Sequence, residues 1–141
     1  MNDPVLNILV IDDDDVSAET VSRALKKVPG KFHVISACDG RDGLEVLRGN
    51  TERKLSRPYL ILLDLNMPRM NGFEFLEQLR GDDGLRDSVV FVLTTSDADA
   101  DRTRAYREQI AGYMVKSAIG PQFVRLSSLL QDYAAAVQLP T

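Results

Sequence analysis

Short apolar runs and amphipathic stretches alternate along the chain. Five apolar runs have the length and composition of β-strands, at residues 6–11, 32–36, 59–63, 89–93 and 112–115. The runs at 59–63 and 89–93 are unbroken, which is typical of parallel strands buried on both faces. Helical spacing follows each run, at residues 15–27, 41–48, a stretch opened by Asn71 and Gly72, 99–109 and 122–138. The pattern predicts an α/β fold with helices on both faces of a parallel sheet.

The last two predicted helices differ in apolar content. Residues 99–109 offer little apolar area, so this helix is expected to be weakly held. Residues 122–138 carry an inward stripe made of Phe123, Leu126, Leu130, Tyr133 and Val137. A second apolar set lies elsewhere on that helix, namely Val124, Leu129, Ala134, Ala135, Ala136 and Leu139. An exposed patch of this kind predicts a homodimer, and the alternative is that the alanines only favour helix and Leu139 frays.

Composition and charge narrow the class of protein. A chain of 141 residues suits one domain, and its net charge of −4 comes without a concentrated basic patch, so nucleic acid is not an expected partner. Arg53, Lys54 and Arg57 are interpreted as a solvated loop, with partner docking as the alternative. No apolar run is long enough to span a bilayer, no secretory signal is recognisable and Cys38 is the only cysteine. We therefore expect a cytoplasmic protein without a membrane partner.

Polar side chains follow the predicted strands where each strand ends. Four aspartates, residues 12–15, follow the first strand, Asp64 follows the third, Thr94 ends the fourth and Lys116 follows the fifth. The carboxyl ends of parallel strands meet at one edge of a sheet, so these groups are expected to converge. Asp14 and Asp15 have a simpler interpretation as the cap and first turn of a helix. Asp64 has none, because a carboxylate after a buried strand is costly unless it is paired.

Together these groups favour phosphoryl transfer. Mg²⁺ prefers a few carboxylates plus waters, and Asp12, Asp13 and Asp64 can supply the oxygens. One oxygen of Asp64 is left as a nucleophile toward a phosphohistidine donor. Lys116 would act as a point charge on the phosphoryl group.

The same residues resemble a known family. The resemblance rests on Ile8 to Asp13, on the run from Leu62 to Gly72 with its Asp-x-x-Met-Pro-x-Met-x-Gly element, on Thr94 and on residues 112–116. This arrangement is similar to the response-regulator receiver domains of two-component signalling. The resemblance implies a flavodoxin-like (βα)5 doubly wound sheet with strand order 2-1-3-4-5. It also implies a phosphoacceptor rather than an enzyme, with a sensor histidine kinase as partner and Mg²⁺ as cofactor.

Roles for individual residues also come from the resemblance. Asp64 would be the phosphoacceptor, and Asp12 and Asp13 would hold Mg²⁺ together with the backbone carbonyl of Asn66. Thr94 would be the switch hydroxyl, Tyr113 the switch aromatic and Lys116 the phosphate partner. Since the last predicted helix ends the chain, residues 1–141 are expected to form a single receiver domain with no output domain. The loop at residues 49–58 and the Thr94–Ser96 segment are similar to stand-alone regulators that work beside bacterial phytochromes.

One position departs from the family. Ser117 follows the lysine, where receivers carry proline in a cis peptide bond. A cis bond to a non-proline residue costs about 3–4 kcal/mol, so the Lys116–Ser117 bond is predicted to be trans.

Two alternatives stay open at this point. Residues 12–16 also fit the Asp-x-Asp-x-(Thr/Val) signature of haloacid-dehalogenase-like phosphatases, in which Asp12 would be the nucleophile. A receiver-like binding module that is never phosphorylated is the other. The residue that carries the phosphoryl group, Asp64 or Asp12, separates the receiver from the phosphatase.

Overall fold

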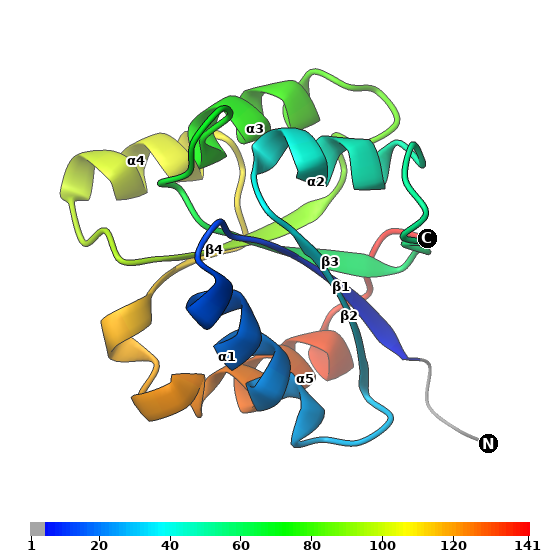
Figure 1. Ribbon diagram of the computed structural model, residues 1–141, viewed down its shortest axis with the longest axis vertical. Coiled ribbons are helices and arrows are strands. Elements are labelled where there is room, and N and C mark those ends of the chain that lie inside the picture. Colours follow the sequence, from blue (N-terminus) through cyan, green and yellow to red (C-terminus); the bar gives the residue numbers. More distant parts are fainter. Residues whose placement is uncertain (1–4) are drawn as a thin grey trace.

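The chain folds into a five-stranded parallel sheet between two layers of helices (Figure 1). The computed structural model describes residues 5–141. The elements are β1 (Leu6–Ile11), α1 (Asp15–Lys26), β2 (Phe32–Ala37), α2 (Gly40–Leu47), β3 (Tyr59–Leu63), α3 (Gly72–Arg80), β4 (Val89–Thr94), α4 (Asp99–Arg107), β5 (Gly112–Val115), the short 3₁₀ turns η1 (Lys116–Ala118) and η2 (Pro121–Phe123), and α5 (Leu126–Ala136). The strand order is β2-β1-β3-β4-β5, so the predicted flavodoxin-like fold is confirmed.

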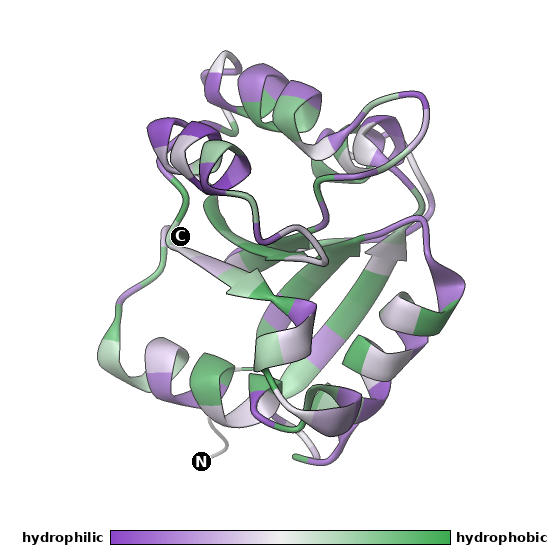
Figure 2. Cartoon of the chain, turned by 90° about the vertical axis from the view of Figure 1, so that its left-hand side faces the viewer, coloured by the Kyte–Doolittle hydropathy of each residue, from purple (hydrophilic) through white to green (hydrophobic). Residues whose placement is uncertain are grey.

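The sheet separates two hydrophobic cores. Side chains that alternate along a strand point to opposite faces, so Ile61 and Leu63 of β3 pack under α2, α3 and α4, whereas Leu60 and Leu62 pack against α1 and α5. All five residues of β3 are buried, as the unbroken apolar run predicted. In Figure 2 the strands between the helix layers are largely hydrophobic. None of the helices in residues 5–141 is long and apolar enough to cross a membrane.

Strand register brings the polar strand ends to one edge. Ile11 of β1 pairs with Leu63 of β3, and Thr94 of β4 pairs with Val115 of β5. The backbone N–H of Asp64 donates to the Ile11 carbonyl at 2.9 Å, which fixes the start of the β3–α3 loop against β1. The residues that follow β1, β3, β4 and β5 therefore lie side by side at the carboxyl edge of the sheet.

The last helix is shorter than the sequence predicted. Instead of one helix over residues 122–138, the chain forms η2 and then α5, because Gln122 and Phe123 adopt left-handed φ angles of 53° and 55°. Leu126 and Leu130 are buried, and Tyr133 meets Phe91 edge to face at 4.9 Å between ring centroids.

Three side chains near the end of the chain were assigned to the wrong surface. Val137 was expected to face inward but lies beyond α5 and is 39% exposed. Ala134 and Leu139 pack against the core cluster under α5 instead of lying on an exposed patch.

Helix α4 is weakly attached, as its composition predicted. Ala105 is its only buried residue, and no side chain caps its N-terminus. Its C-terminal end is held more firmly, because the Arg80 guanidinium donates to the carbonyls of Glu108 at 2.7 Å and Gln109 at 3.1 Å. The burial of Arg80 lowers its pKa from the usual value. Arg80 thus ties the C-terminal end of α4 to the body of the domain.

The arginines of the basic cluster in the α2–β3 loop make hydrogen bonds and ion pairs with neighbouring elements. Arg53 makes two hydrogen bonds to the Asp42 carboxylate, at 2.6 and 3.0 Å, and one to the Ser36 carbonyl. Arg57 pairs with Asp87 at 2.9 Å. Lys54 is exposed and both arginine side chains remain partly exposed, so the loop is solvated as predicted, while the two guanidinium groups also fasten it to neighbouring elements.

Candidate functional site

Three carboxylates converge at the carboxyl edge of the sheet. Oxygens of Asp12, Asp13 and Asp64 lie within 4.8 Å of one another. Asp12 and Asp64 are 6% and 7% exposed, whereas Asp13 is exposed to solvent. Hard divalent cations bind such oxygen clusters, and like charges this close repel one another without a cation. The cluster is therefore typical of a divalent-metal site.

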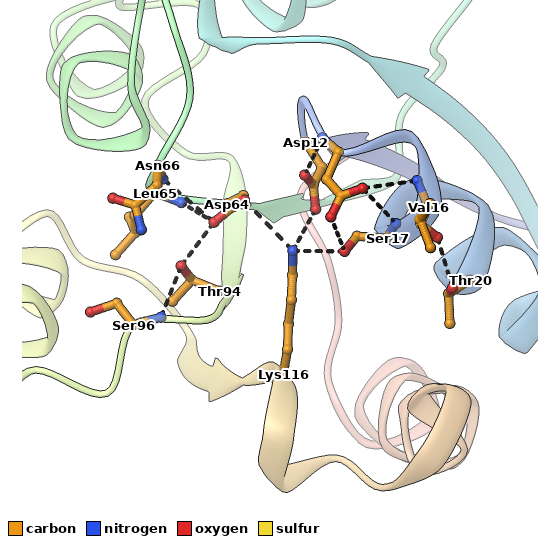
Figure 3. A network of polar contacts seen from close by, with 11 residues as sticks. Asp12, Val16, Ser17, Thr20, Asp64, Leu65, Asn66, Thr94, Ser96 and Lys116 are labelled. Carbon is orange, nitrogen blue, oxygen red and sulfur yellow. Dashed lines mark hydrogen bonds and ion pairs between the residues drawn. The ribbon is translucent and has the colours of Figure 1, made fainter.

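The two oxygens of the Asp64 carboxylate have different surroundings (Figure 3). Oδ1 accepts hydrogen bonds from the Leu65 backbone N–H at 2.7 Å and from the Thr94 hydroxyl at 2.8 Å. Oδ2 lies 3.6 Å from Nζ of Lys116, within ion-pair range. One oxygen is therefore held by neutral donors, and the other faces the ammonium group.

Gly72 permits the close packing behind Asp64. Its N–H donates to the Leu65 carbonyl at 3.0 Å, which folds the β3–α3 loop back on itself. A Cβ at this position would lie 2.5 Å from the Asp64 carbonyl oxygen and 2.8 Å from Cα of Leu65. No side chain fits there unless the backbone that carries the Asp64 carboxylate moves.

Lys116 provides the positive charge of the site. Its Nζ lies 2.9 Å from Oδ2 of Asp12, and its side chain is nearly buried. Burial raises the pKa of Asp12, while the hydrogen bond from Lys116 opposes that effect. The only cis peptide bond in residues 5–141 is Arg57–Pro58, so the predicted trans Lys116–Ser117 bond is confirmed. Lys116 is the first residue of the turn η1.

Asp14 has the helix-capping role that was its simpler interpretation. Its side chain accepts from the backbone N–H groups of Val16 at 3.0 Å and Ser17 at 3.4 Å. These hydrogen bonds hold the pKa of Asp14 below its usual value. Asp15 occupies the first turn of α1, so neither residue belongs to the carboxylate cluster.

Polar contacts connect Asp64 to helix α4. Thr94 is fully buried and already donates to Asp64. The Tyr113 hydroxyl, on β5, donates to the Ser96 carbonyl at 3.0 Å. The Ser96 hydroxyl donates to the Asp101 carboxylate at 2.6 Å, in the first turn of α4. The two predicted switch residues therefore meet the same short segment between β4 and α4.

Asn66 lies in the loop that follows Asp64. Its backbone N–H is 3.4 Å from Oδ1 of Asp64. It also lines a surface hollow of about 460 Å³ together with Asp13 and Arg104. The metal-ligand role predicted for its backbone carbonyl stays a prediction.

Ser17 is a site residue that the sequence interpretation missed. It lies in the first turn of α1, is buried and accepts a hydrogen bond from Lys116 at 3.1 Å. A serine three residues after the capping Asp14 was the available signal. The spacing of Asp14 and Ser17 is typical of ordinary helix capping. Only the folded structure brings Lys116 next to Ser17.

A doubly wound sheet that gathers three carboxylates, a threonine and a lysine at its strand ends defines a class of phosphoacceptor domains. The chain belongs to the response regulator receiver domain family, whose model matches residues 8–125. As a member of this family it is a phosphoacceptor rather than an enzyme, which argues against the phosphatase alternative at Asp12.

Individual relatives agree with this assignment. The chain is 31% identical over 131 residues to the probable methanogenesis regulatory protein FilR2 of Methanothrix harundinacea, covering 93% of this chain and 84% of that protein. It is 32% identical over 117 residues to the response regulator Rcp1 of Synechocystis, covering 82% and 80%.

Solved structures show the same likeness. The phosphorylated cyanobacterial phytochrome response regulator RcpA is similar with a TM-score of 0.87 and 28% identity over 98% of this chain and 100% of that one. The Mn²⁺-bound form of Rcp1 follows with a TM-score of 0.83 and 28% identity, again over 98% and 100%. The resemblance to phytochrome-associated response regulators is thus confirmed.

Proposed function

We propose that this chain is a single-domain response regulator that accepts a phosphoryl group on Asp64 from a sensor histidine kinase in a Mg²⁺-dependent reaction. The observation that carries the proposal is the asymmetric carboxylate of Asp64. It lies at the end of the buried strand β3, with one oxygen bonded to Thr94 and the other facing Lys116. Asp12 and Asp13 complete the charge of the site.

The chemistry is a transfer between nitrogen and oxygen. A carboxylate oxygen of Asp64 attacks phosphorus, the P–N bond of the phosphohistidine breaks, and the imidazole leaves with the electron pair and takes up a proton. Asp12, Asp13, Asp64 and the Asn66 backbone carbonyl would hold Mg²⁺, which neutralises charge on the phosphoryl oxygens. Lys116 binds one of those oxygens, and the hollow beside Asp13 leaves the site open to a donor.

Phosphorylation would be read out through Thr94 and α4. The Thr94 hydroxyl exchanges its acceptor from the Asp64 carboxylate to a phosphoryl oxygen. Because Tyr113 and Asp101 both bond to Ser96, a shift of the segment after Thr94 reaches the N-terminus of α4. That end of α4 has no side-chain cap, so it can move at low cost.

The test is to treat the protein with acetyl phosphate and Mg²⁺ and to map the label by mass spectrometry. We expect a single phosphoryl group on Asp64, and no label without a divalent cation. Asp64→Asn should abolish labelling, whereas Asp15→Asn, an exposed carboxylate outside the cluster, should not. Label on Asp12 would instead indicate the phosphatase chemistry, and full labelling of Asp64→Asn would contradict the assignment.

The phosphoryl donor we propose is a cytoplasmic histidine kinase, with a bacterial phytochrome as first candidate. The support is the similarity to RcpA and to the bacteriophytochrome response regulators RtBRR and AtBRR, each 28% identical. A panel of kinases that includes a phytochrome, incubated with labelled ATP, tests the pairing. Transfer from unrelated kinases alone would remove the phytochrome from the proposal.

The proposed homodimer rests on exposed apolar side chains at the C-terminal third. Val124 is 50% exposed and Leu129 is 39% exposed, while Ala134 and Leu139 pack against the core and do not contribute to the patch. A two-fold arrangement would pair the same surface on both copies. Analytical ultracentrifugation at micromolar concentration, with and without beryllofluoride, should show a dimer that Leu129→Lys weakens. A monomer under both conditions would remove the idea.

A further inference from the structure

Ser17 joins the capping end of α1 to the ammonium of Lys116. Its hydroxyl donates to Oδ2 of Asp14 at 3.2 Å and accepts from Nζ of Lys116 at 3.1 Å (Figure 3). The hydroxyl proton is committed to Asp14, so a lone pair of the oxygen is left for the lysine. The residue is 9% exposed and lies inside the site.

The ammonium has three N–H donors, and two of them have acceptors at bonding distance. Oδ2 of Asp12 lies at 2.9 Å and Oγ of Ser17 at 3.1 Å. Oδ2 of Asp64 lies at 3.6 Å, which is close enough for an ion pair and too long for a hydrogen bond. A phosphoryl group on Asp64 would carry its oxygens beyond the carboxylate, within reach of the third donor.

A lysine side chain needs such support. Its four-carbon stem has many rotamers, and an ammonium held by one partner alone would swing about that contact. A second carboxylate would hold it equally well but would compete with the phosphoryl group for its charge. A neutral hydroxyl fixes the direction of the ammonium without that competition.

We propose that Ser17 is a positioning residue for Lys116, which together with Asp12 leaves one ammonium N–H free for the phosphoryl group on Asp64. The inference deepens the proposed function and rests on phosphorylation of Asp64. It also gives Asp14 a second task, because the helix cap orients the Ser17 hydroxyl that receives the lysine.

The kinetic test compares Ser17→Ala with Ser17→Thr and with the matched control Thr20→Ala. Thr20 lies one turn further along α1, and its hydroxyl bonds only to the Val16 carbonyl within the same helix, so its loss does not touch the site. With acetyl phosphate and saturating Mg²⁺, Ser17→Ala should lower the maximal phosphorylation rate about fivefold, the worth of one hydrogen bond. Thr20→Ala should stay at the wild-type rate, Ser17→Thr should recover most of the loss, and the Mg²⁺ affinity should not change.

The Lys116→Met variant shows whether the effect of Ser17→Ala depends on Lys116. If Ser17 acts through Lys116, adding Ser17→Ala to Lys116→Met should not slow the residual reaction further. An equal slowing in both backgrounds, or a wild-type rate for Ser17→Ala, would overturn the proposal. Loss of rate in Thr20→Ala to the same degree would also overturn it, since helix stability alone would then explain the effect.

A second readout does not depend on phosphorylation. Urea unfolding of the wild type, both single variants and the double variant, without metal, gives the coupling between the two side chains. We expect the unfolding equilibrium constant to show a coupling of about fivefold, and independent effects would overturn the contact. A wild type that takes no phosphoryl group on Asp64 would defeat the proposed function instead, while the coupling still decides whether Ser17 holds Lys116.

Discussion

The replacement Lys116→Met removes the cation of the site and keeps the length of the side chain. Among the described residues, Lys116 is the only cation paired with Asp12 or Asp64. All three side chains are at most 9% exposed. The variant therefore leaves two buried carboxylates facing each other without a counter-charge, next to the exposed Asp13.

The size of the effect follows from these distances. At separations of 2.9 and 3.6 Å and an effective dielectric constant of about 20, the two attractions amount to about 6 and about 5 kcal/mol. Desolvation of the three charges offsets most of this, and removal of one partner from a buried pair costs about 3–5 kcal/mol. Burial already raises the pKa of Asp12, so this carboxylate can take up a proton and lose its uncompensated charge. We therefore expect a loss of stability at the lower end of this range. About 3 kcal/mol corresponds to a melting temperature lower by about 10 °C in a domain of this size.

The loss should depend on pH and on metal. Without Lys116 the pKa of Asp12 rises further, and a carboxyl group whose folded pKa lies above its unfolded value loses stability as pH rises through the folded pKa. The deficit should therefore be larger in mildly alkaline than in mildly acidic buffer. Millimolar Mg²⁺ should narrow it, because a cation bound only to the folded state replaces part of the missing charge.

Thermal unfolding followed by circular dichroism, in EDTA and in Mg²⁺, checks these expectations. Lys26→Met, at an exposed position in the last turn of α1, is the matched control and should melt close to the wild type. A Lys116→Met variant that melts like the wild type in EDTA, or whose deficit is indifferent to Mg²⁺, would refute the reasoning.

Three further outcomes can be measured. The Arg53 hydrogen bonds lower the pKa of Asp42 from 3.8 to about 2, so its contribution is present above the unfolded value and lost as pH falls toward 2. Because Arg53 is partly exposed, Asp42→Asn should lower the free energy of unfolding in urea by only about 1 kcal/mol at neutral pH. It should also flatten the acid limb of the stability profile, that is, the fall of the unfolding free energy as pH is lowered. An acid limb as steep as in the wild type would contradict this. Gly72→Ala should slow Asp64 phosphorylation and cost about 2 kcal/mol or more, since its Cβ meets backbone, and normal kinetics would show that the loop yields freely. Beryllofluoride with Mg²⁺ should change amide exchange from Thr94 through α4, and unchanged protection there would exclude the proposed switch.

The local pattern of apolar and polar residues was enough to predict the bounds of a strand where the strand's own sequence marks its ends. The bounds of β1, β3 and β5 match the predicted runs, because the apolar segment at Tyr59–Leu63 ends at a charged residue and is buried throughout. Convergence of Asp12, Asp13 and Asp64 was also predictable, since parallel strands must end at the same edge.

Long-range contacts account for what was missed. Ser17 meets a lysine 99 residues away, and Arg80 bonds to carbonyls near residue 108, so neither role leaves a local signature. The break before α5 depends on left-handed backbone at Gln122 and Phe123, which the helical spacing of the apolar residues conceals. Helical periodicity indicates which residues share a buried face, but it does not indicate where the chain must turn before the helix begins.

The partition of the interior by the sheet has a consequence for how such a regulator can diversify. Helix α4 contributes only Ala105 to the core on its side, whereas α1 and α5 pack into the opposite core. Apart from Arg104, which lines the hollow beside Asp13, the solvent-facing residues of α4 can therefore be exchanged with little effect on folding or on the carboxylate cluster. Substitutions on the surface of this one helix could therefore create a binding site for a different partner protein, while the carboxylate cluster around Asp64 keeps its geometry.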